Sequence, residues 1–404
     1  MEKEKIVNIK TTYSVNVAGS MVESLRVNNN LTTTVRVYDE GFIGVAGRIG
    51  ECDEQELIAE SQEKLSQKIP YPCNLTENVQ KSVDNVKEII CPNKFVATAK
   101  SLIDRLNKTF PDYVFSNKIN MTDSYVSYEN SKNTKLEYHG NNVMVSLVVQ
   151  KKGSGNIMDF GLGFMDNRYD EDEYVSDMAT LIDNFDKRVE MPEEELPIII
   201  EANFIGTALV EFLAEKYVMG ASLFNGKLGT KIFNEKVNIY NDRDPYNKYA
   251  LEFFDAEGVV PENNRYYFVK DGVFTGLITT KRSSANFNLP LSGSAAAAFD
   301  GVPSFSGNGF AVGTTAEKTS DLVKDAIYVC VTSGGDMTPS GDVGLPIMLA
   351  YLVRDGKIVG RLPEFSIGGN LSDILGKDFI GIAKCDLFKI CSDDMVVAKF
   401  KINK

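Results

Sequence analysis

A short segment near the middle of the chain limits how the whole chain can fold. Met191-Pro-Glu-Glu-Glu-Leu-Pro197 joins two prolines to a run of acids, and an apolar run at residues 198–200 follows it. Boundaries between domains are typically polar and proline-rich, because few packed contacts cross them. A chain of 404 residues also exceeds what one ordinary hydrophobic core holds. We therefore expect two domains, covering residues 1–190 and 197–404.

Alternation of polar and apolar residues dominates the first domain. Ser14-Val-Asn-Val17 and Thr33-Thr-Val-Arg-Val37 have this period of two, which predicts antiparallel strands. Asn28-Asn-Asn30, Asp39-Glu-Gly41 and His139-Gly-Asn-Asn142 have the composition of turns between strands. The pattern as a whole predicts a meander of strands joined by tight turns.

Three stretches of the same domain are predicted to form helices instead, two of them from apolar residues at helical spacing and the third from the charges at its ends. They cover residues 53–67, 96–108 and 170–187. Acidic residues open the first and third stretches, where they stabilise the positive end of a helix dipole. The fold class expected for the first domain is therefore α+β, an antiparallel sheet with helices.

The second domain is predicted to be rich in strands, in a mixed arrangement. A helix at residues 207–219 comes first and ends at Gly220. Two later stretches, at residues 266–277 and 349–359, place Asp-Gly between apolar runs, which is a strong signal for a β-hairpin. Together the two domains predict an α+β protein.

The chain contains a single histidine, His139, and this limits its chemistry. A Ser-His-Asp or Cys-His hydrolase would have to use that residue, which lies in a predicted turn of the first domain. Zinc peptidases hold the metal with imidazoles, typically two on one helix, and one histidine cannot supply them. A zinc site built by this chain alone is therefore not expected.

The cysteines and the terminal residues indicate a cellular location. Six cysteines lie at positions 52, 73, 91, 330, 385 and 391, without a Cys-x-x-Cys pair. The first residues, Met-Glu-Lys-Glu-Lys, are charged, and no stretch approaches the ~20 apolar residues of a membrane-spanning helix. We expect free thiols, a cytoplasmic location and no membrane partner.

The net charge disfavours nucleic acid as a partner. The formal charge is −13, whereas duplex binding depends on Lys and Arg residues that neutralise phosphates. The sequence also lacks a basic stripe and a helix-turn-helix signature. No nucleic-acid partner is therefore expected.

Two pairs of acids leave one catalytic alternative open. Glu211 with Glu215, or Asp255 with Glu257, would provide paired carboxylates, which can serve as general acid and base. Asp255 and Gly258 also suit a tight turn, and this explains their presence without catalysis. An active hydrolase that uses such a carboxylate site is therefore one hypothesis for this chain.

Short glycine-containing landmarks follow one another through the second half of the chain. They are Asp255-Ala-Glu-Gly-Val259, Lys270-Asp-Gly-Val-Phe-Thr-Gly276, Thr280-Lys-Arg-Ser-Ser-Ala285, Leu291-Ser-Gly293, Pro339-Ser-Gly-Asp342, Ala350-Tyr-Leu-Val-Arg-Asp-Gly356 and Ile367-Gly-Gly-Asn-Leu371. Each alone is a weak turn motif, but their order and spacing resemble the TldD/PmbA family. The resemblance implies a metallopeptidase-type protein. The family's other label, modulator of DNA gyrase, gains no support from the acidic charge of this chain.

One segment resembles the helix that binds zinc in the catalytic members of that family. Gly206-Thr-Ala-Leu-Val-Glu-Phe-Leu-Ala-Glu215 aligns without gaps to the family's Gly-x-x-Leu-His-Glu-x-x-x-His. Glu211 matches the catalytic glutamate, whereas Val210 and Glu215 stand where the family has its two histidines. The resemblance thus implies that Glu211 is inactive, because no metal-bound water is present for it to activate.

The family's remaining zinc ligand is a cysteine near the C-terminus, which Cys391 matches better than Cys385. Loss of both histidines is typical of the PmbA (TldE) members of the family. The resemblance therefore implies no cofactor in this chain, zinc only in a catalytic TldD-like partner, and a dimer with that partner or with itself. Its substrate would be a peptide or an unfolded protein. The alternative is a non-catalytic peptide-binding or scaffolding protein without a peptidase partner.

Peptide recognition is expected in the second domain, around residues 291–313. Serine, glycine and a run of four alanines at residues 295–298 remove side-chain bulk, so that a foreign backbone can approach and form main-chain hydrogen bonds. A flexible surface loop is the alternative interpretation of this segment. The residues expected to line the cleft are Ser292, Gly293, Ser294, Asn308 and Gly309.

Overall fold

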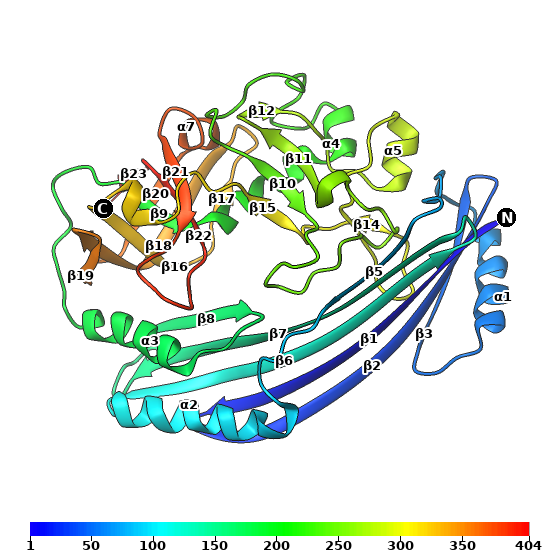
Figure 1. Ribbon diagram of the computed structural model, residues 1–404. Coiled ribbons are helices and arrows are strands. Elements are labelled where there is room, and N and C mark those ends of the chain that lie inside the picture. Colours follow the sequence, from blue (N-terminus) through cyan, green and yellow to red (C-terminus); the bar gives the residue numbers. More distant parts are fainter. Residues whose placement is uncertain (404) are drawn as a thin grey trace.

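The computed structural model describes residues 1–403, and Figure 1 shows that a long, curved sheet runs along one side of the molecule. Residues from 198 onward form a second group of strands on the concave side of this sheet. The predicted fold class is confirmed: an antiparallel sheet with helices comes first, and a mixed, strand-rich part follows. No helix among the described residues is long and apolar enough to cross a membrane.

The curved sheet contains the first eight strands, in the order β4-β3-β2-β1-β6-β7-β5, with β8 paired to β7. Neighbouring strands are antiparallel, except that β5 runs parallel to β7. Four strands are 17 to 19 residues long, and the twist that accumulates over such lengths curves the sheet. The strands are β1 (Glu2–Ala18), β2 (Met21–Asp39), β3 (Phe42–Ile49), β4 (Ile69–Pro70), β5 (Gln80–Asn85), β6 (Tyr113–Asn130), β7 (Thr134–Lys151) and β8 (Phe160–Asp166).

Two turns that the sequence predicts in this sheet are wrong. Residues 28–30 lie in the middle of β2, opposite residues 10–12 of β1. Residues 139–142 lie within β7, opposite residues 122–125 of β6, and that hairpin turns instead at residues 131–133. In a wide sheet the cross-strand hydrogen bonds outweigh the local turn preference of asparagine and glycine.

The helices predicted in the first part are confirmed, with small shifts at their ends. They are α1 (Glu54–Lys64), α2 (Phe95–Thr109) and α3 (Glu171–Phe185). The carboxylates of Asp53 and Asp170 cap α1 and α3, because each accepts a hydrogen bond from a backbone N–H in the first turn. The turn at residues 39–41 is also confirmed, between β2 and β3. Figure 1 shows α2 along the convex side of the sheet and α3 beside β8.

The second part contains a nine-stranded sheet, a four-stranded sheet and a strand pair. The large sheet has the order β21-β22-β9-β16-β18-β20-β23, with β17 and β19 also paired to β18, and it is mixed because β9 and β16 are parallel. Its strands are β9 (Ile198–Glu201), β16 (Ala326–Thr332), β17 (Asp336–Met337), β18 (Asp342–Arg354), β19 (Lys357–Arg361), β20 (Phe365–Asn370), β21 (Phe379–Lys384), β22 (Asp394–Ala398) and β23 (Lys401–Asn403).

The smaller sheets and short helices complete this part. The four-stranded sheet has the order β12-β11-β10-β15, and β13 pairs with β14. Both Asp-Gly hairpins are confirmed, since Lys270 pairs with Val273 and Arg354 pairs with Lys357. The elements are β10 (Ile239–Asp242), β11 (Arg265–Lys270), β12 (Val273–Phe274), β13 (Ala295–Ala296), β14 (Ser304–Phe305), β15 (Phe310–Val312), α4 (Ala214–Val218), α5 (Lys281–Phe287), α6 (Thr319–Leu322) and α7 (Leu371–Ile374).

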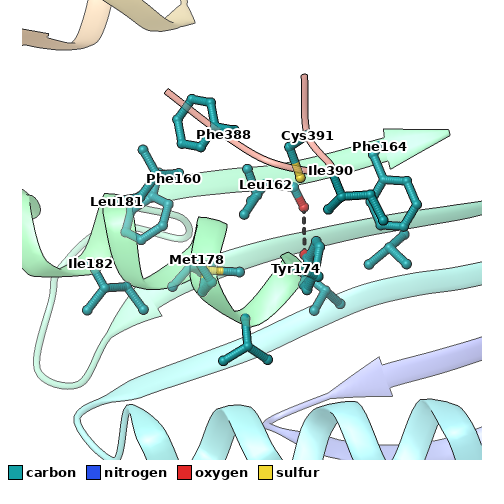
Figure 2. Packing of buried hydrophobic residues seen from close by; sticks show 14 of the residues in the cluster. Phe160, Leu162, Phe164, Tyr174, Met178, Leu181, Ile182, Phe388, Ile390 and Cys391 are labelled. Carbon is teal, nitrogen blue, oxygen red and sulfur yellow. Dashed lines mark hydrogen bonds between the residues drawn. The ribbon is translucent and has the colours of Figure 1, made fainter. Parts of the chain in front are cut away.

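Helix α3 joins the two groups of strands. Its apolar side packs between β8 and the loop that follows β21, and the Tyr174 hydroxyl donates to the Leu162 carbonyl (Figure 2). On the same helix, the Asp177 carboxylate accepts hydrogen bonds from the backbone N–H groups of residues 389–391 in that loop. The packed side chains are Phe160, Leu162, Tyr174, Met178, Leu181, Phe388, Ile390 and Cys391.

This packing gives the two groups of strands a continuous hydrophobic core, although no strand of β1–β8 pairs with one of β9–β23. Each group keeps its own sheets, and the segment at residues 186–197 connects them. The division into domains at residues 1–190 and 197–404 stays a prediction. Separate sheets favour two domains, whereas the shared hydrophobic core favours one.

Candidate functional site

The segment that aligns to the family's zinc-binding helix is not one α-helix. A 3₁₀ helix (Ala202–Phe212) ends at Leu213, whose backbone is extended (φ −61°, ψ 131°), and α4 begins only after it. The backbone N–H of Ile278 donates to the Phe212 carbonyl, just before this break, and the Ile278 carbonyl accepts from the Ala214 N–H, just after it. The predicted helix at residues 207–219 is therefore wrong, because a neighbouring segment takes the hydrogen bonds that would continue the helix.

The break lies between the two positions that hold histidines in the family. Val210 is 42% exposed at the end of the 3₁₀ helix, and Glu215 is partly buried in the first turn of α4. The valine side chain has no lone pair, and one carboxylate cannot replace two imidazoles as zinc ligands. The two positions therefore lack both the chemistry and the common helix face of a zinc site.

Glu211 is held by the protein itself. Its side chain is buried, and the Oε1 atom accepts from the Lys216 Nζ at 2.5 Å while Oε2 accepts from the backbone N–H of Leu223 at 2.8 Å. The Ser222 hydroxyl donates to the Glu211 carbonyl at 2.6 Å. Because both carboxylate oxygens already have donors, Glu211 connects the 3₁₀ helix to α4 and to the loop behind it.

Cys391 lies in the loop after β21, in the hydrophobic cluster of Figure 2. Its backbone N–H donates to the Asp177 carboxylate at 2.9 Å. Burial, with the charge of Asp177, raises the pKa of the Cys391 thiol, and burial raises the pKa of Cys385 to about 12. Both thiols are therefore neutral at physiological pH, whereas a metal ligand has to be a thiolate.

These positions do not fit zinc. Within residues 1–403, no three His, Cys, Asp or Glu side chains are grouped so that they could hold a metal ion. Glu211 is already paired with a lysine, and Cys391 belongs to a different hydrophobic cluster from the residues around Glu211. The donor set of the family's catalytic members is thus neither present nor brought together.

Most residues of the expected peptide cleft lie beneath the surface. The Ser292 hydroxyl donates to the carbonyl of Thr279 and accepts from its N–H, and the Gly293 carbonyl accepts from the Asn241 amide. Ser294 is buried, and its hydroxyl finds no partner within residues 1–403. These three residues are buried, so a ligand cannot contact them in this structure.

Asn308 and Gly309 lie further along the same segment and are less buried. Asn308 is exposed and borders a cavity. Gly309 has a φ of 85°, and a Cβ at this position would lie 2.4 Å from the Asn241 Oδ1. Only glycine therefore fits beside Asn241, and Gly309 fixes the path of the chain at the edge of the cavity.

The cavity has a volume of about 280 Å³ and is lined by residues of β1, β2 and β6 on one side and by the alanine-rich segment on the other. Its walls come from both parts of the chain, and five of its residues are consecutive, from Ala295 to Phe299. The first part contributes Ile6, Asn8, Thr32, Thr34, Arg36 and Val126, and the second contributes Arg243, Glu252, Phe254, Asp255, Ala256, Ala295, Ala296, Ala297, Ala298, Phe299 and Asn308.

The polar wall follows from the alternation of β1 and β2. Asn8 pairs with Thr32, and the even-numbered residues of both strands face the concave side. Arg36 shares this side, is 2% exposed, and pairs through Nη1 with the Glu4 carboxylate at 2.7 Å. Burial opposes the charged form, but the charge of Glu4 raises the pKa of Arg36. Two tyrosine hydroxyls also donate to Glu4, and such extra donors offset the desolvation of a buried ion pair.

Arg243 lies in the wall that the second part contributes. It is 3% exposed, and among residues 1–403 its guanidinium donates only to backbone carbonyls, those of Glu252, Gly293 and Phe254. Burial lowers the pKa of Arg243, against the opposing charges of Asp255 and Glu252. The side chain stays cationic, because a guanidinium is not deprotonated in proteins.

The second pair of acids is buried and hydrogen-bonded. Asp255 accepts from three backbone N–H groups. Glu257 accepts from the Tyr71 hydroxyl at 2.5 Å and from the backbone N–H of Lys281 at 2.8 Å. Burial, together with the charge of Asp255, raises the pKa of Glu257 to about 7. The two carboxylates brace the turn at residues 255–259 against the first part and α5.

Sequence reasoning did not find Arg36, Arg243 or the cavity between them. A signal existed for Arg36, because its even position in an alternating strand places it beside Thr32 and Thr34 on the polar face. The contact of that strand with the second part had no sequence signal. Arg36 donates to the carbonyl of Ala256, which lies 220 residues further along the chain.

Comparisons with known proteins agree with this architecture. The PmbA/TldA metallopeptidase C-terminal domain matches residues 194–401, which is more than half of the chain. A protein of Archaeoglobus fulgidus named metalloprotease is 21% identical over 390 residues, covering 89% of this chain and 87% of that protein. Another metalloprotease, of Methanothermobacter thermautotrophicus, is 27% identical over 217 residues, or 48% of this chain and 46% of that protein.

Solved structures share the fold over the full chain. TldE from Thermococcus kodakarensis superposes with a TM-score of 0.80 at 17% identity, covering 100% of this chain and 97% of that one. A Thermotoga maritima protein described as a candidate modulator of a DNA gyrase gives a TM-score of 0.77 at 13% identity, covering 100% of this chain and 95% of that one. The chain is therefore one of the proteins in which a long curved sheet is followed in sequence by a metallopeptidase-type C-terminal domain.

The chain belongs to the PmbA/TldD family. The family resemblance seen in the ordered landmarks of the second half is thus confirmed, and it extends to the fold of the first half.

Proposed function

We propose that this chain is a PmbA/TldE-like subunit of a cytoplasmic TldD/PmbA-type metallopeptidase system, and that it acts in proteolysis or peptide maturation without a zinc ion of its own. A TldD-like chain that retains both motif histidines would supply the zinc and the chemistry. This chain would form a dimer with it and would hold part of the peptide or unfolded protein that the pair acts on.

One observation carries the proposal: the family's metal-binding segment has become a structural element. Val210 and Glu215 lie on either side of a helix break, and Glu211 is occupied by Lys216 and Leu223. A segment that had merely lost its ligands would leave the glutamate free. Here the same glutamate has a stabilising role, which supports a subunit that relies on another chain for catalysis.

The test compares this chain alone with this chain co-expressed with a TldD-like protein from the same organism. We expect the TldD-like protein to co-purify, zinc to be present near one ion per pair and absent from this chain alone, and an unstructured peptide to be cleaved only by the pair. Glu211→Gln in this chain should leave cleavage unchanged, whereas the same change at the glutamate of the partner's motif should abolish it.

Two results would contradict the proposal. Stoichiometric zinc in this chain alone, lost on Cys391→Ser, would show that it builds its own metal site. Failure to retain any TldD-like protein, with peptide binding preserved, would favour the scaffolding function instead.

A further inference from the structure

The cavity contains cationic groups with unused hydrogen-bond donors. Arg36 is buried, and its Nε has no partner within residues 1–403. The Nη2 atoms of Arg36 and Arg243 likewise donate to no described residue, and neither atom is sealed inside the protein. Both arginines are among the residues that line the cavity. Two cationic side chains with free donors therefore belong to the wall of one space.

Arg243 has no direct ion-pair partner within residues 1–403, although the charges of Asp255 and Glu252 act on it. Arg36 has Glu4 as its ion-pair partner, but Arg243 is hydrogen-bonded to carbonyls alone. Asp255 also lines the cavity, yet its oxygens accept from three backbone N–H groups, and Glu252 forms no ion pair. The planar fork of a guanidinium matches the two oxygens of a carboxylate, and a bond of this kind is strongest where water is excluded.

An unused acceptor accompanies these donors. The Asn8 Oδ1 is buried and has no partner within residues 1–403, and Asn8 lines the same cavity from β1. A volume of about 280 Å³ is small for a ligand site, which typically measures about 300–1,000 Å³, so the space suits the end of a chain better than its middle.

We propose that this cavity binds the C-terminal carboxylate of a peptide. Arg243 donates to the carboxylate, and Arg36 and Asn8 line the same space. Residues 295–298 provide a wall without side-chain bulk, along which the rest of the peptide leaves the cavity. The inference rests on the proposed function, because it names the group of the peptide substrate that this subunit recognises.

The composition of the chain offers a direct binding assay. It contains no tryptophan, so a tryptophan placed in a peptide can be excited selectively at the long-wavelength edge of its absorption, where the 17 tyrosines of the protein do not absorb. The probes are acetyl-Ala-Ala-Trp-Ala-Ala as the free acid and as the C-terminal amide, and the readout is the anisotropy of the peptide tryptophan. We expect the free acid to bind the complete chain at least tenfold more tightly than the amide, because the amide lacks the charge that Arg243 pairs with.

Matched variants locate the site. Arg243→Met should abolish the preference for the acid, whereas Arg26→Met, at an exposed position of β2, should keep it. If Arg243→Met fails to fold, Ala297→Phe provides the second test, since it fills the cavity from a partly exposed position and should weaken binding of the acid at least tenfold. Its control is Ala97→Phe, on the exposed side of α2.

The outcomes separate this inference from the proposed function. Equal binding of the acid and the amide would overturn carboxylate recognition and leave a peptide-binding subunit in place. An amidated peptide with an internal glutamate that binds as tightly as the free acid would overturn the assignment to the C-terminus. If neither probe binds while the pair with a TldD-like protein still cleaves peptides, this cavity is not the peptide site.

Discussion

Glu257 provides a stability test with a definite sign. Its folded pKa is about 7, against an ordinary value of 4.5, because the carboxyl is buried beside the charge of Asp255. Between these two values the folded state binds more protons than the unfolded state, so stability has to fall as the pH rises through this window. A shift of this size corresponds to about 3 kcal/mol in total, at roughly 1.4 kcal/mol per pH unit.

Glu257→Gln should remove this dependence, because the amide keeps the shape of the side chain and never ionises. When the pH is raised from near 5 to near 8, we expect the free energy of unfolding of the variant to rise by roughly 2–3 kcal/mol relative to that of the unchanged protein. Thermal or urea unfolding of both proteins at the two pH values measures the difference, in which the contributions of groups that do not interact with Glu257 cancel.

Glu364→Gln, at an exposed position, is the control and should leave the pH dependence as it was. The reasoning fails if Glu257→Gln unfolds with the same pH dependence as the unchanged protein. The same pH dependence would mean that Glu257 is already ionised in the folded state, with its charge offset by Lys281 and the Tyr71 hydroxyl.

Two further predictions follow from the site. Gly309→Ala should lower the free energy of unfolding, measured in urea, by about 1–3 kcal/mol, because the alanine would need a positive φ. Its control, Gly206→Ala, has open space around the Cβ position and should leave that free energy nearly unchanged. Equal losses in the two variants would contradict the backbone argument. In alkylation followed by mass spectrometry, the exposed Cys52 and Cys91 should react well before Cys391, whose thiol is buried and has a raised pKa, and rapid labelling of Cys391 in the folded protein would count against that packing.

The sequence predicted those elements whose signals are local. The helices α1 and α3 begin at aspartates that cap them, and both Asp-Gly hairpins turn where their sequence requires positive φ. In each case the residues that determine the element are neighbours in the chain. No distant partner was needed to find them.

The errors all arise where distant segments pair. Residues 28–30 and 139–142 look like turns in isolation, but β1 and β6 supply strand partners for them. The helix expected at residues 207–219 breaks at Leu213 because the backbone of Ile278 is hydrogen-bonded there. Tertiary pairing of this kind overrides local preference, and a single sequence does not reveal it.

The candidate site could be predicted only in part for the same reason. Four alanines and the glycines marked residues 291–313 as a place for close backbone approach, and the structure places six residues of this segment, 295–299 and Asn308, in a cavity wall. The charged wall opposite belongs to β2. Nothing in the sequence brings Arg36 and Arg243 into one space.

Helix α3 has a mechanical consequence for that space. The cavity walls belong to both parts of the chain, while Asp177 clamps the parts together through three consecutive N–H groups at residues 389–391. The two parts are also joined at the cavity itself, where Arg36 donates to the Ala256 carbonyl, and again where the Tyr71 hydroxyl donates to the Glu257 carboxylate. Because separate contacts hold the two parts together, the cavity walls should keep a fixed separation. A spin label on β2 and another at Asp300 should therefore show the same distance with and without a peptide, whereas a change in that distance would show that the walls move.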